Sequence, residues 1–274
     1  MQLFPDSRAQ VLLNSTRDSY AGKIFDMTPK TNMHRSENHC FKTALRMRLF
    51  MPQVPTCQSL CRNHVDAEGF HWRGGCGYGG IRTNTHNEVA RMVKTILQYS
   101  GCNVRVEEPH QFSDGKKGDL TVRGLDGYQY QTLVLDVRIT SAVPANGAAI
   151  TEVNANDVNF PDKVLDNNAK EKIDRKLLLL AGFVPLIIDT SGRMHKDLKT
   201  LLERALKSAA VVRSIPFSVF QHYWFSALMF TLHNAQTRGM ETLKHMVLGR
   251  EYVGTFDTSD SVVSRSSFVV SSHT

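Results

Sequence analysis

"LVLDVRIT", residues 133–140, decides which fold class this sequence predicts. Side chains alternate between the two faces of a strand, so the apolar residues at every second position from Leu133 to Ile139 share one face. Asp136 points to the opposite face, with Val134 and Arg138 as its neighbours there. Asp136 thus projects from a strand that is otherwise apolar on both faces, and it is the first candidate for chemistry.

A second acid stands in the preceding segment, "KGDLTV", residues 117–122. The same alternation places Leu120 and Val122 inward and Asp119 on the opposite face. If the two segments pair as a hairpin, Asp119 and Asp136 converge on one face of the sheet. Two close carboxylates without water repel each other, and a divalent cation relieves the repulsion. Carboxylate oxygens with water suit Mg²⁺ or Mn²⁺, which also bind a substrate phosphate.

The segments around these two strands alternate between the helical and the strand period, with two helices before them and three after. The apolar stripe Phe41, Leu45 and Leu49 of the first helix is expected in the core, and Thr85 is expected to cap the second helix. The predicted helices span residues 36–50, 84–100, 166–182, 194–210 and 217–248, and two further strands span residues 102–109 and 183–189. From residue 84 the order is α, β, β, β, α, β, α, which indicates an α/β fold.

The segment "PTCQSLCRNHVDAEGFHWRGGCGYGG", residues 55–80, carries ligand-capable side chains with the spacing C-x3-C-x9-H-x4-C. Three thiolates and one imidazole form a tetrahedral structural zinc set. The predicted ligands are Cys57, Cys61, His71 and Cys76, with His64 as a spare. No Gly-Lys-Ser or Gly-Lys-Thr follows the glycines, which argues against a phosphate-binding loop of the Walker type. The alternative is that these cysteines are buried without a metal.

Composition narrows the functional classes. The 274 residues carry a net charge of +7, with 41% hydrophobic and 22% charged residues, as in a folded soluble protein. A basic chain favours polyanionic partners such as DNA. With five cysteines and no signal peptide or membrane-spanning run, we expect free or metal-bound thiols rather than disulfides. The expected setting is intracellular: the nucleus in a eukaryote, otherwise the cytoplasm.

Four further charged residues are candidates for a role beside the predicted acids. Arg138 can stabilise charge on a phosphate but cannot act as a base. Lys172 and Lys176 lie four residues apart and share a helix face, either near the acids or as solvated charges. Glu88 completes a Thr85-x-x-Glu88 capping box, which explains it without a metal role.

Taken in order, several pieces of residues 44–192 resemble one family. They are "ALRMRL", the Cys/His segment, "GGIRTNTHNEV", "KKGDLTV", "LVLDVRITS", "AKEKIDRK" and "GFVPLIIDTSG". In this order they resemble the C-terminal region of target-specific, non-long-terminal-repeat retrotransposon reverse transcriptases. There a CCHC zinc knuckle precedes a restriction-like endonuclease of the PD-(D/E)XK superfamily. Just over half of the chain is covered, without a reverse-transcriptase domain, so the resemblance implies a freestanding or domesticated derivative.

The resemblance implies roles for particular residues. Glu88, Asp119 and Asp136 would be the acidic metal ligands, with the carbonyl of Val137 as a further one. The family's strand lysine falls at Arg138 here, and Lys172 on the following helix matches the place to which that lysine sometimes migrates. The family usually has proline at position 118, where this chain has glycine.

The expected architecture is a restriction-endonuclease-like αβββαβ core, with a mixed central sheet flanked by helices, a zinc knuckle and a helical C-terminal extension. The boundaries are an N-terminal helical segment (1–50), the knuckle (51–82), the nuclease-like domain (83–210), the extension (211–257) and a Ser-rich flexible tail (258–274). The leading functional hypothesis is a DNA endonuclease using Mg²⁺ or Mn²⁺, with structural Zn²⁺. RNA is left open as a partner, and no membrane is expected. The alternatives are a catalytically inactive nucleic-acid-binding protein with this fold, or a structural or protein-interaction protein.

Overall fold

The computed structural model describes residues 7–26, 31–53, 57–58, 64–74, 76, 80–107, 117–126, 132–143, 150–174 and 182–248. The predictions for the Ser-rich segment 258–274 and for Lys176 fall outside these residues. None of the helices within the described ranges is both long enough and apolar enough to span a membrane.

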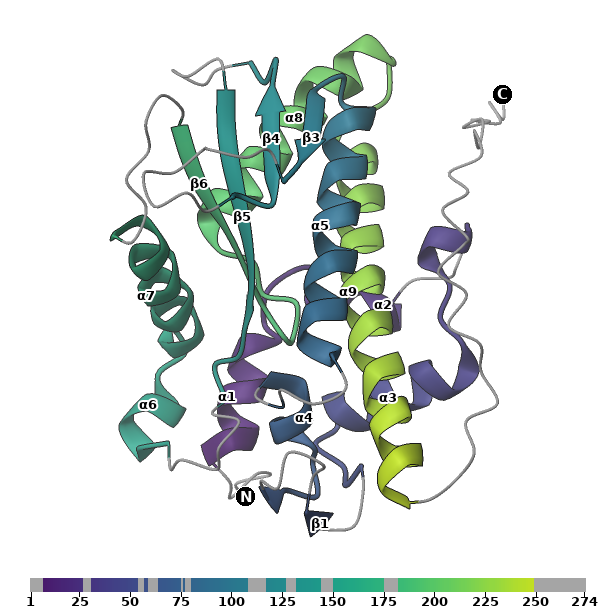
Figure 1. Cartoon of the computed structure of the whole chain (residues 1–274), viewed down its shortest axis with the longest axis vertical. Coiled ribbons are helices and arrows are strands. Elements are labelled where there is room, and N and C mark those ends of the chain that lie inside the picture. The colour runs from purple at the N-terminus through teal and green to yellow at the C-terminus, as the bar shows by residue number, and fades with distance from the viewer. Residues whose placement is uncertain are drawn as a thin grey trace.

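The centre of the molecule is a four-stranded mixed sheet (Figure 1). Its strands are β3 (Asn103–Val106), β4 (Leu120–Arg123), β5 (Thr132–Thr140) and β6 (Gly182–Asp189), in that spatial order. β3, β4 and β5 pair antiparallel, and β6 runs parallel to β5. This confirms the α/β class and the predicted hairpin between the two acid-bearing segments.

β5 is longer than its neighbour β4, and this difference creates a step in the sheet. The ladder with β4 covers β5 from Thr132 to Leu135. The ladder with β6 continues along β5 as far as Thr140. Asp136 is therefore the first β5 residue beyond the end of β4.

Helices cover both faces of the sheet. α5 (Ile81–Tyr99) and α8 (Lys196–Val212) share one apolar cluster with the inward residues of β3 to β6. α7 (Phe160–Asp174) packs on the other face, where Leu165 and Ala169 contact Ile187 of β6. Figure 1 shows α7 on one side of the strands and α5 on the other. The alternation predicted for β5 is confirmed, because Leu133, Leu135, Val137 and Ile139 all join the α5 and α8 cluster.

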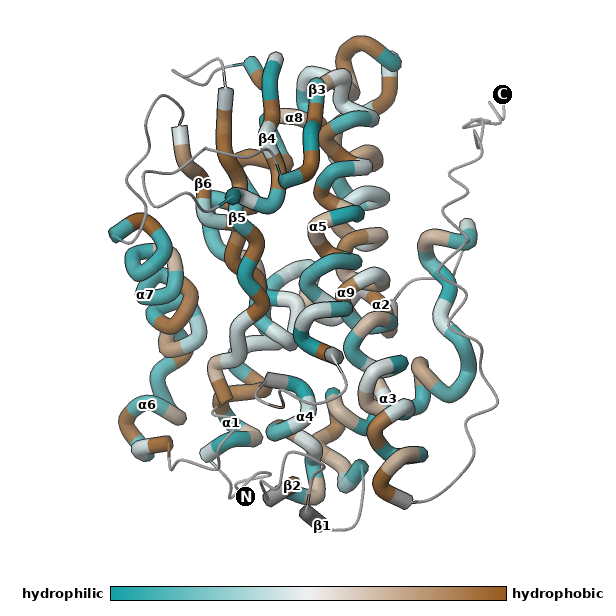
Figure 2. Tube along the Cα trace, viewed as in Figure 1, coloured by the Kyte–Doolittle hydropathy of each residue, from teal (hydrophilic) through white to brown (hydrophobic). Residues whose placement is uncertain are grey.

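The last helix, α9 (Phe217–Leu248), was expected as an appended extension, but it forms part of the main core. Trp224, Phe225 and Met229 are buried in the cluster that also contains the sheet. Figure 2 shows hydrophobic residues along α9 and α5, which run side by side. The two helices are in close contact at Gly239, where an added Cβ would lie 2.7 Å from a side-chain carbon of Ile81.

The N-terminal part is helical, as expected. It contains α1 (Ser7–Ser15), α2 (Lys23–Asp26), a short 3-10 helix at Asn32–His34 and α3 (Asn38–Arg48). The remaining short elements are β1 (Cys57–Gln58), β2 (His64–Val65), α4 (Phe70–Gly74) and α6 (Glu152–Asn156). β1 and β2 form a separate antiparallel pair within the predicted knuckle.

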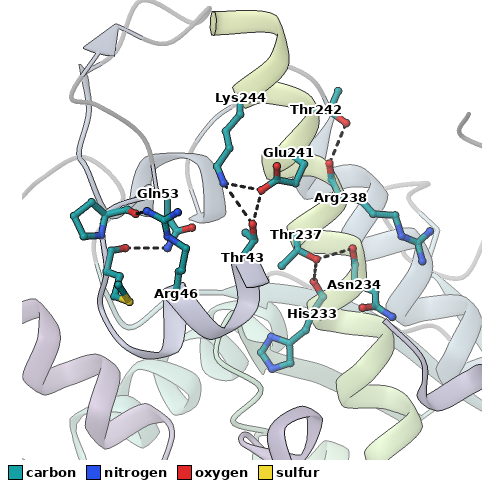
Figure 3. Close-up of polar contacts among 12 residues, drawn as sticks. Thr43, Arg46, Gln53, His233, Asn234, Thr237, Arg238, Glu241, Thr242 and Lys244 are labelled. Atoms are coloured by element: carbon teal, nitrogen blue, oxygen red, sulfur yellow. Dashed lines mark hydrogen bonds and ion pairs between the residues drawn. The ribbon is translucent and has the colours of Figure 1, made fainter. Parts of the chain in front are cut away.

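The predicted core face of α3 was wrong. Phe41 and Leu45 are each 37% exposed and Leu49 is 54% exposed. The buried side chains are instead Cys40, Thr43, Ala44 and Met47. Figure 3 shows the reason: the hydroxyl of Thr43 donates to Glu241 of α9, and the ammonium of Lys244 binds the same carboxylate at 2.6 Å. These polar contacts turn the Thr43 face toward α9.

Three boundaries also differ from the prediction. α5 begins at Ile81 after Gly80, whose φ of 65° is unstrained for glycine, so Thr85 is a buried interior residue and no capping box forms. α7 begins at Phe160, so part of the Asn-rich stretch expected as a connection is helical. Gly182 was expected to end a helix, but it is the first residue of β6.

Candidate functional site

Asp119 and Asp136 meet at the step in the sheet. Asp119 lies just before β4, and its N–H donates to the carbonyl of Leu135 at 2.9 Å, which aligns it beside Asp136. The N–H of Val137 donates to Asp119 Oδ2 at 2.6 Å. The two carboxyl groups are also within hydrogen-bonding reach of each other. The predicted convergence of the two acids is therefore present.

The environment of Asp119 favours its charged form. Burial alone would raise the pKa of this carboxyl, but the hydrogen bond and charge of His86 act in the opposite direction. The Val137 amide and the contact with Asp136 add to the effect, so the pKa of Asp119 lies below its ordinary value.

His86 of α5 is a site residue that the sequence prediction missed. Its Nε2 lies 3.1 Å from Asp119 Oδ2, and its Nδ1 lies 3.2 Å from the Asn87 side-chain oxygen. Both partners are acceptors, an arrangement that favours the doubly protonated ring. The hydrogen bond to Asp119 raises the pKa of His86, against the opposing effect of burial. The sequence offered one signal for His86: it lies two residues before Glu88, near the start of the helix that was expected to supply a site residue.

Glu88 does not join this group. Its carboxylate lies 2.6 Å from the guanidinium of Arg91 one turn along α5, and its side chain is 41% exposed. Two residues along a helix correspond to a rotation of about 200°, so His86 and Glu88 point in different directions. The place beside Asp119 that was expected for Glu88 is taken by His86.

Lys172 reaches the acid pair from α7. Its ammonium lies 2.6 Å from Asp136 Oδ1, and both side chains are largely buried. Arg138, which follows Asp136 on the same strand face, binds Glu171 at 2.7 Å instead of either acid. The cation nearest to the acid pair on the α7 side is thus the helix lysine rather than the strand arginine.

The donor set fits a small hard cation. In the described parts of the chain, no group of three or more His, Cys, Asp or Glu side chains is arranged to hold a metal. Mg²⁺ commonly uses only one or two protein carboxylates and completes its shell with water and substrate phosphates. Asp119 and Asp136 can supply that pair. At Val137, it is the amide that contacts Asp119, and a role for its carbonyl stays a prediction.

Half of the predicted zinc set can be located. His71 on α4 and Cys76 are both buried, and the Cys76 N–H donates to the carbonyl of His71 at 2.8 Å. Cys76 packs in an apolar cluster with Trp72 and Ile81. Cys61 and the side chains of Cys57 and His64 fall outside the described residues, so the four-ligand site stays a prediction.

A groove of about 360 Å³ opens beside Asp119, between α5 and the edge of the sheet. It is lined by His86, Asn87, Ala90, Arg91, Lys94, Val106, Glu107, Asp119 and Leu120. A ligand in this groove would contact one of the two acids directly.

Comparison of the sequence with protein-family models and with curated proteins finds no match in either set.

Proposed function

We propose that this chain is a divalent-metal-dependent endonuclease that hydrolyses phosphodiester bonds in DNA, with a restriction-endonuclease-like core. The observation that carries the proposal is the meeting of Asp119, which immediately precedes β4, with Asp136 of β5 and Lys172 of α7. The order αβββαβ and the basic net charge of +7 are consistent with it.

Each of these residues has a role in the proposed reaction. Asp119 and Asp136 provide the hard oxygen ligands for Mg²⁺ or Mn²⁺, which when bound would activate water and stabilise charge on the scissile phosphate. Lys172 places a positive charge beside Asp136, where it can orient the attacking water or neutralise the phosphate. His86 and the Val137 amide both bind Oδ2 of Asp119 and hold its carboxylate toward the step.

The hydrolysis itself follows an in-line displacement. The water oxygen forms a bond to phosphorus as the bond from phosphorus to the leaving deoxyribose oxygen breaks. One proton leaves the attacking water and one is taken up by the leaving oxygen, so the products are a phosphomonoester and a free hydroxyl.

In the knuckle segment, structural Zn²⁺ on the four predicted ligands remains part of the proposal, and zinc analysis of the purified protein tests it.

Cleavage of supercoiled plasmid DNA tests the proposal. We expect nicking with Mg²⁺ or Mn²⁺ and none with a chelator. Asp119→Asn and Asp136→Asn should each lower the rate by at least about 100-fold, because each removes a charged ligand while keeping its shape. Asp126→Asn, which alters an exposed acid just after β4, is the matched control. Equal nicking by all three variants and the wild type would rule out the assigned site.

A further inference from the structure

The groove beside Asp119 has the chemistry of a binding site for a nucleic-acid backbone. Asn87, Ala90, Arg91 and Lys94 stand at helix positions i, i+3, i+4 and i+7, so they form one face of α5. From His86 to Lys94 the helix rises by about 12 Å, at roughly 1.5 Å per residue. That length corresponds to about three nucleotides at an axial rise of roughly 3.4 Å each.

The charges in this groove leave an excess of positive charge for a ligand. Each acid in its wall already has a cationic partner: Asp119 binds His86, and Glu107 lies 3.8 Å from the ammonium of Lys117. Arg91 is shared with Glu88, although its side chain is 63% exposed. Lys94 forms no ion pair with any residue that the structure describes. An anionic ligand is therefore favoured along the α5 side.

The opposite wall, at the edge of the sheet, carries aliphatic carbons beside its two acids, Glu107 and Asp119. Val106, at the end of β3, is 52% exposed and lines the groove together with Leu120. A surface with cations along one side and aliphatic carbons along the other matches a nucleotide, whose phosphate is charged and whose sugar is largely apolar. The groove volume of about 360 Å³ is within the range that accommodates a ligand of this size.

We propose that this groove binds the backbone phosphates next to the cleaved one, with Lys94 and Arg91 as the phosphate-contacting residues. The inference rests on the proposed function, because it takes Asp119 as the reacting end of the groove. It adds a direction to that function: the bound DNA strand runs from the Asp119–Asp136 step along α5, toward the C-terminal end of that helix.

Binding without metal separates this inference from the nuclease activity. The probe is a short fluorescein-labelled DNA duplex in buffer without Mg²⁺ or Mn²⁺, and the measurement is fluorescence anisotropy over a series of salt concentrations. Lys94→Ala and Arg91→Ala should each weaken binding by about tenfold and lower the slope of log K against log[salt] by about 0.9, the value for one phosphate contact. Lys94→Arg, which keeps the charge, should bind like the wild type.

Two further variants provide the controls. Glu88→Gln releases Arg91 from its partner and should tighten binding. Lys207→Ala removes the same charge from an exposed position on α8 and should change neither affinity nor slope. Wild-type binding by the Lys94→Ala/Arg91→Ala double variant would overturn the inference, and so would an equal loss in Lys207→Ala. If the groove variants lose binding but no plasmid is nicked with metal, only the proposed function fails.

Discussion

At the scale of single residues, the position of Asp136 just beyond the end of β4 makes it available for chemistry. It is 7% exposed, and a carboxylate so buried is costly unless it is paired. The ammonium of Lys172 at 2.6 Å provides the pairing from α7. Because β4 has ended, the Asp119 carboxylate can approach from the side, and the amide of Val137 fixes it there. The account of function depends on these few atoms.

Lys172 and Arg138 allow a direct comparison of two cations close to Asp136. Lys172→Met removes the ammonium beside Asp136 and should lower the plasmid cleavage rate by at least about 100-fold. Arg138→Met breaks only a partly exposed pair with Glu171 and should change the rate by less than about fivefold. Single-turnover cleavage of the two variants measures both effects. A larger loss of rate in Arg138→Met than in Lys172→Met would instead assign the catalytic role to Arg138.

The buried ring of His233 on α9 should make the free energy of unfolding depend on pH. Burial, together with the charge of Arg73 in the same interior, lowers the pKa of His233 to about 4. The unfolded chain binds a proton at this ring below about pH 6.5 and the folded chain does not, so stability falls as the pH drops from about 6.5 to 4. The contribution is roughly 3 kcal/mol.

Urea unfolding at several pH values between 4 and 7 measures this contribution. His233→Gln removes the titrating ring, so the loss of stability across that interval should become smaller. An unchanged pH dependence in the variant would show that another group is responsible.

The sequence predicted part of the candidate site and missed one residue for a geometric reason. Asp119 and Asp136 could be paired because strand alternation fixes their side-chain directions once the hairpin forms. On α5, however, His86 and Glu88 are both plausible partners for Asp119. Which of the two contacts it depends on the rotation of the helix about its axis relative to the sheet. That rotation is set by packing of the buried α5 residues and by where the helix begins, neither of which the spacing of charges reveals.

At the scale of elements, strands were easier to predict than helix faces. The alternation along β5 fixes which residues share a face, whereas α3 offers two competing faces for burial. Phe41, Leu45 and Leu49 form the more apolar stripe, but α9 binds the other face through Thr43. The deciding partner lies about two hundred residues further along the chain, so a local pattern contained no sign of it.

The crossing of α5 and α9 gives a prediction at this scale. Gly239→Ala improves helix propensity by about 1 kcal/mol, but the new methyl carbon would lie 2.7 Å from Ile81 Cγ1 and 2.9 Å from its Cγ2. We expect a net destabilisation of about 1–3 kcal/mol, because the helices must separate.

A double-mutant cycle checks this explanation by chemical denaturation. In an Ile81→Ala background, which removes the two nearest of the three Ile81 carbons that the methyl group would meet and keeps only the Cβ at 3.1 Å, Gly239→Ala should cost clearly less. A cost that is the same in both backgrounds would locate the strain elsewhere.

At the scale of the whole molecule, the α/β order from α5 to α8 followed from the sequence, while the place of α9 did not. Its residues lacked a clear amphipathic stripe because the helix is covered on several sides, by α5, α8 and α3. The expected extension is thus part of the core that supports the sheet. The acid pair and its two cationic partners, contributed by α5 and α7, are held by elements far apart in the chain, which is how a folded protein keeps like charges together.

Binding of Mn²⁺ tests the central claim most directly, because the ion is paramagnetic and its unbound fraction is measured by electron paramagnetic resonance. The titration is carried out on wild-type protein with a short DNA duplex, on the Asp119→Asn/Asp136→Asn double variant and on Asp126→Asn. The account predicts that the wild type and Asp126→Asn bind Mn²⁺ alike and that the double variant binds at least about tenfold more weakly. Equal binding by all three proteins would contradict it, as would the absence of binding by the wild type.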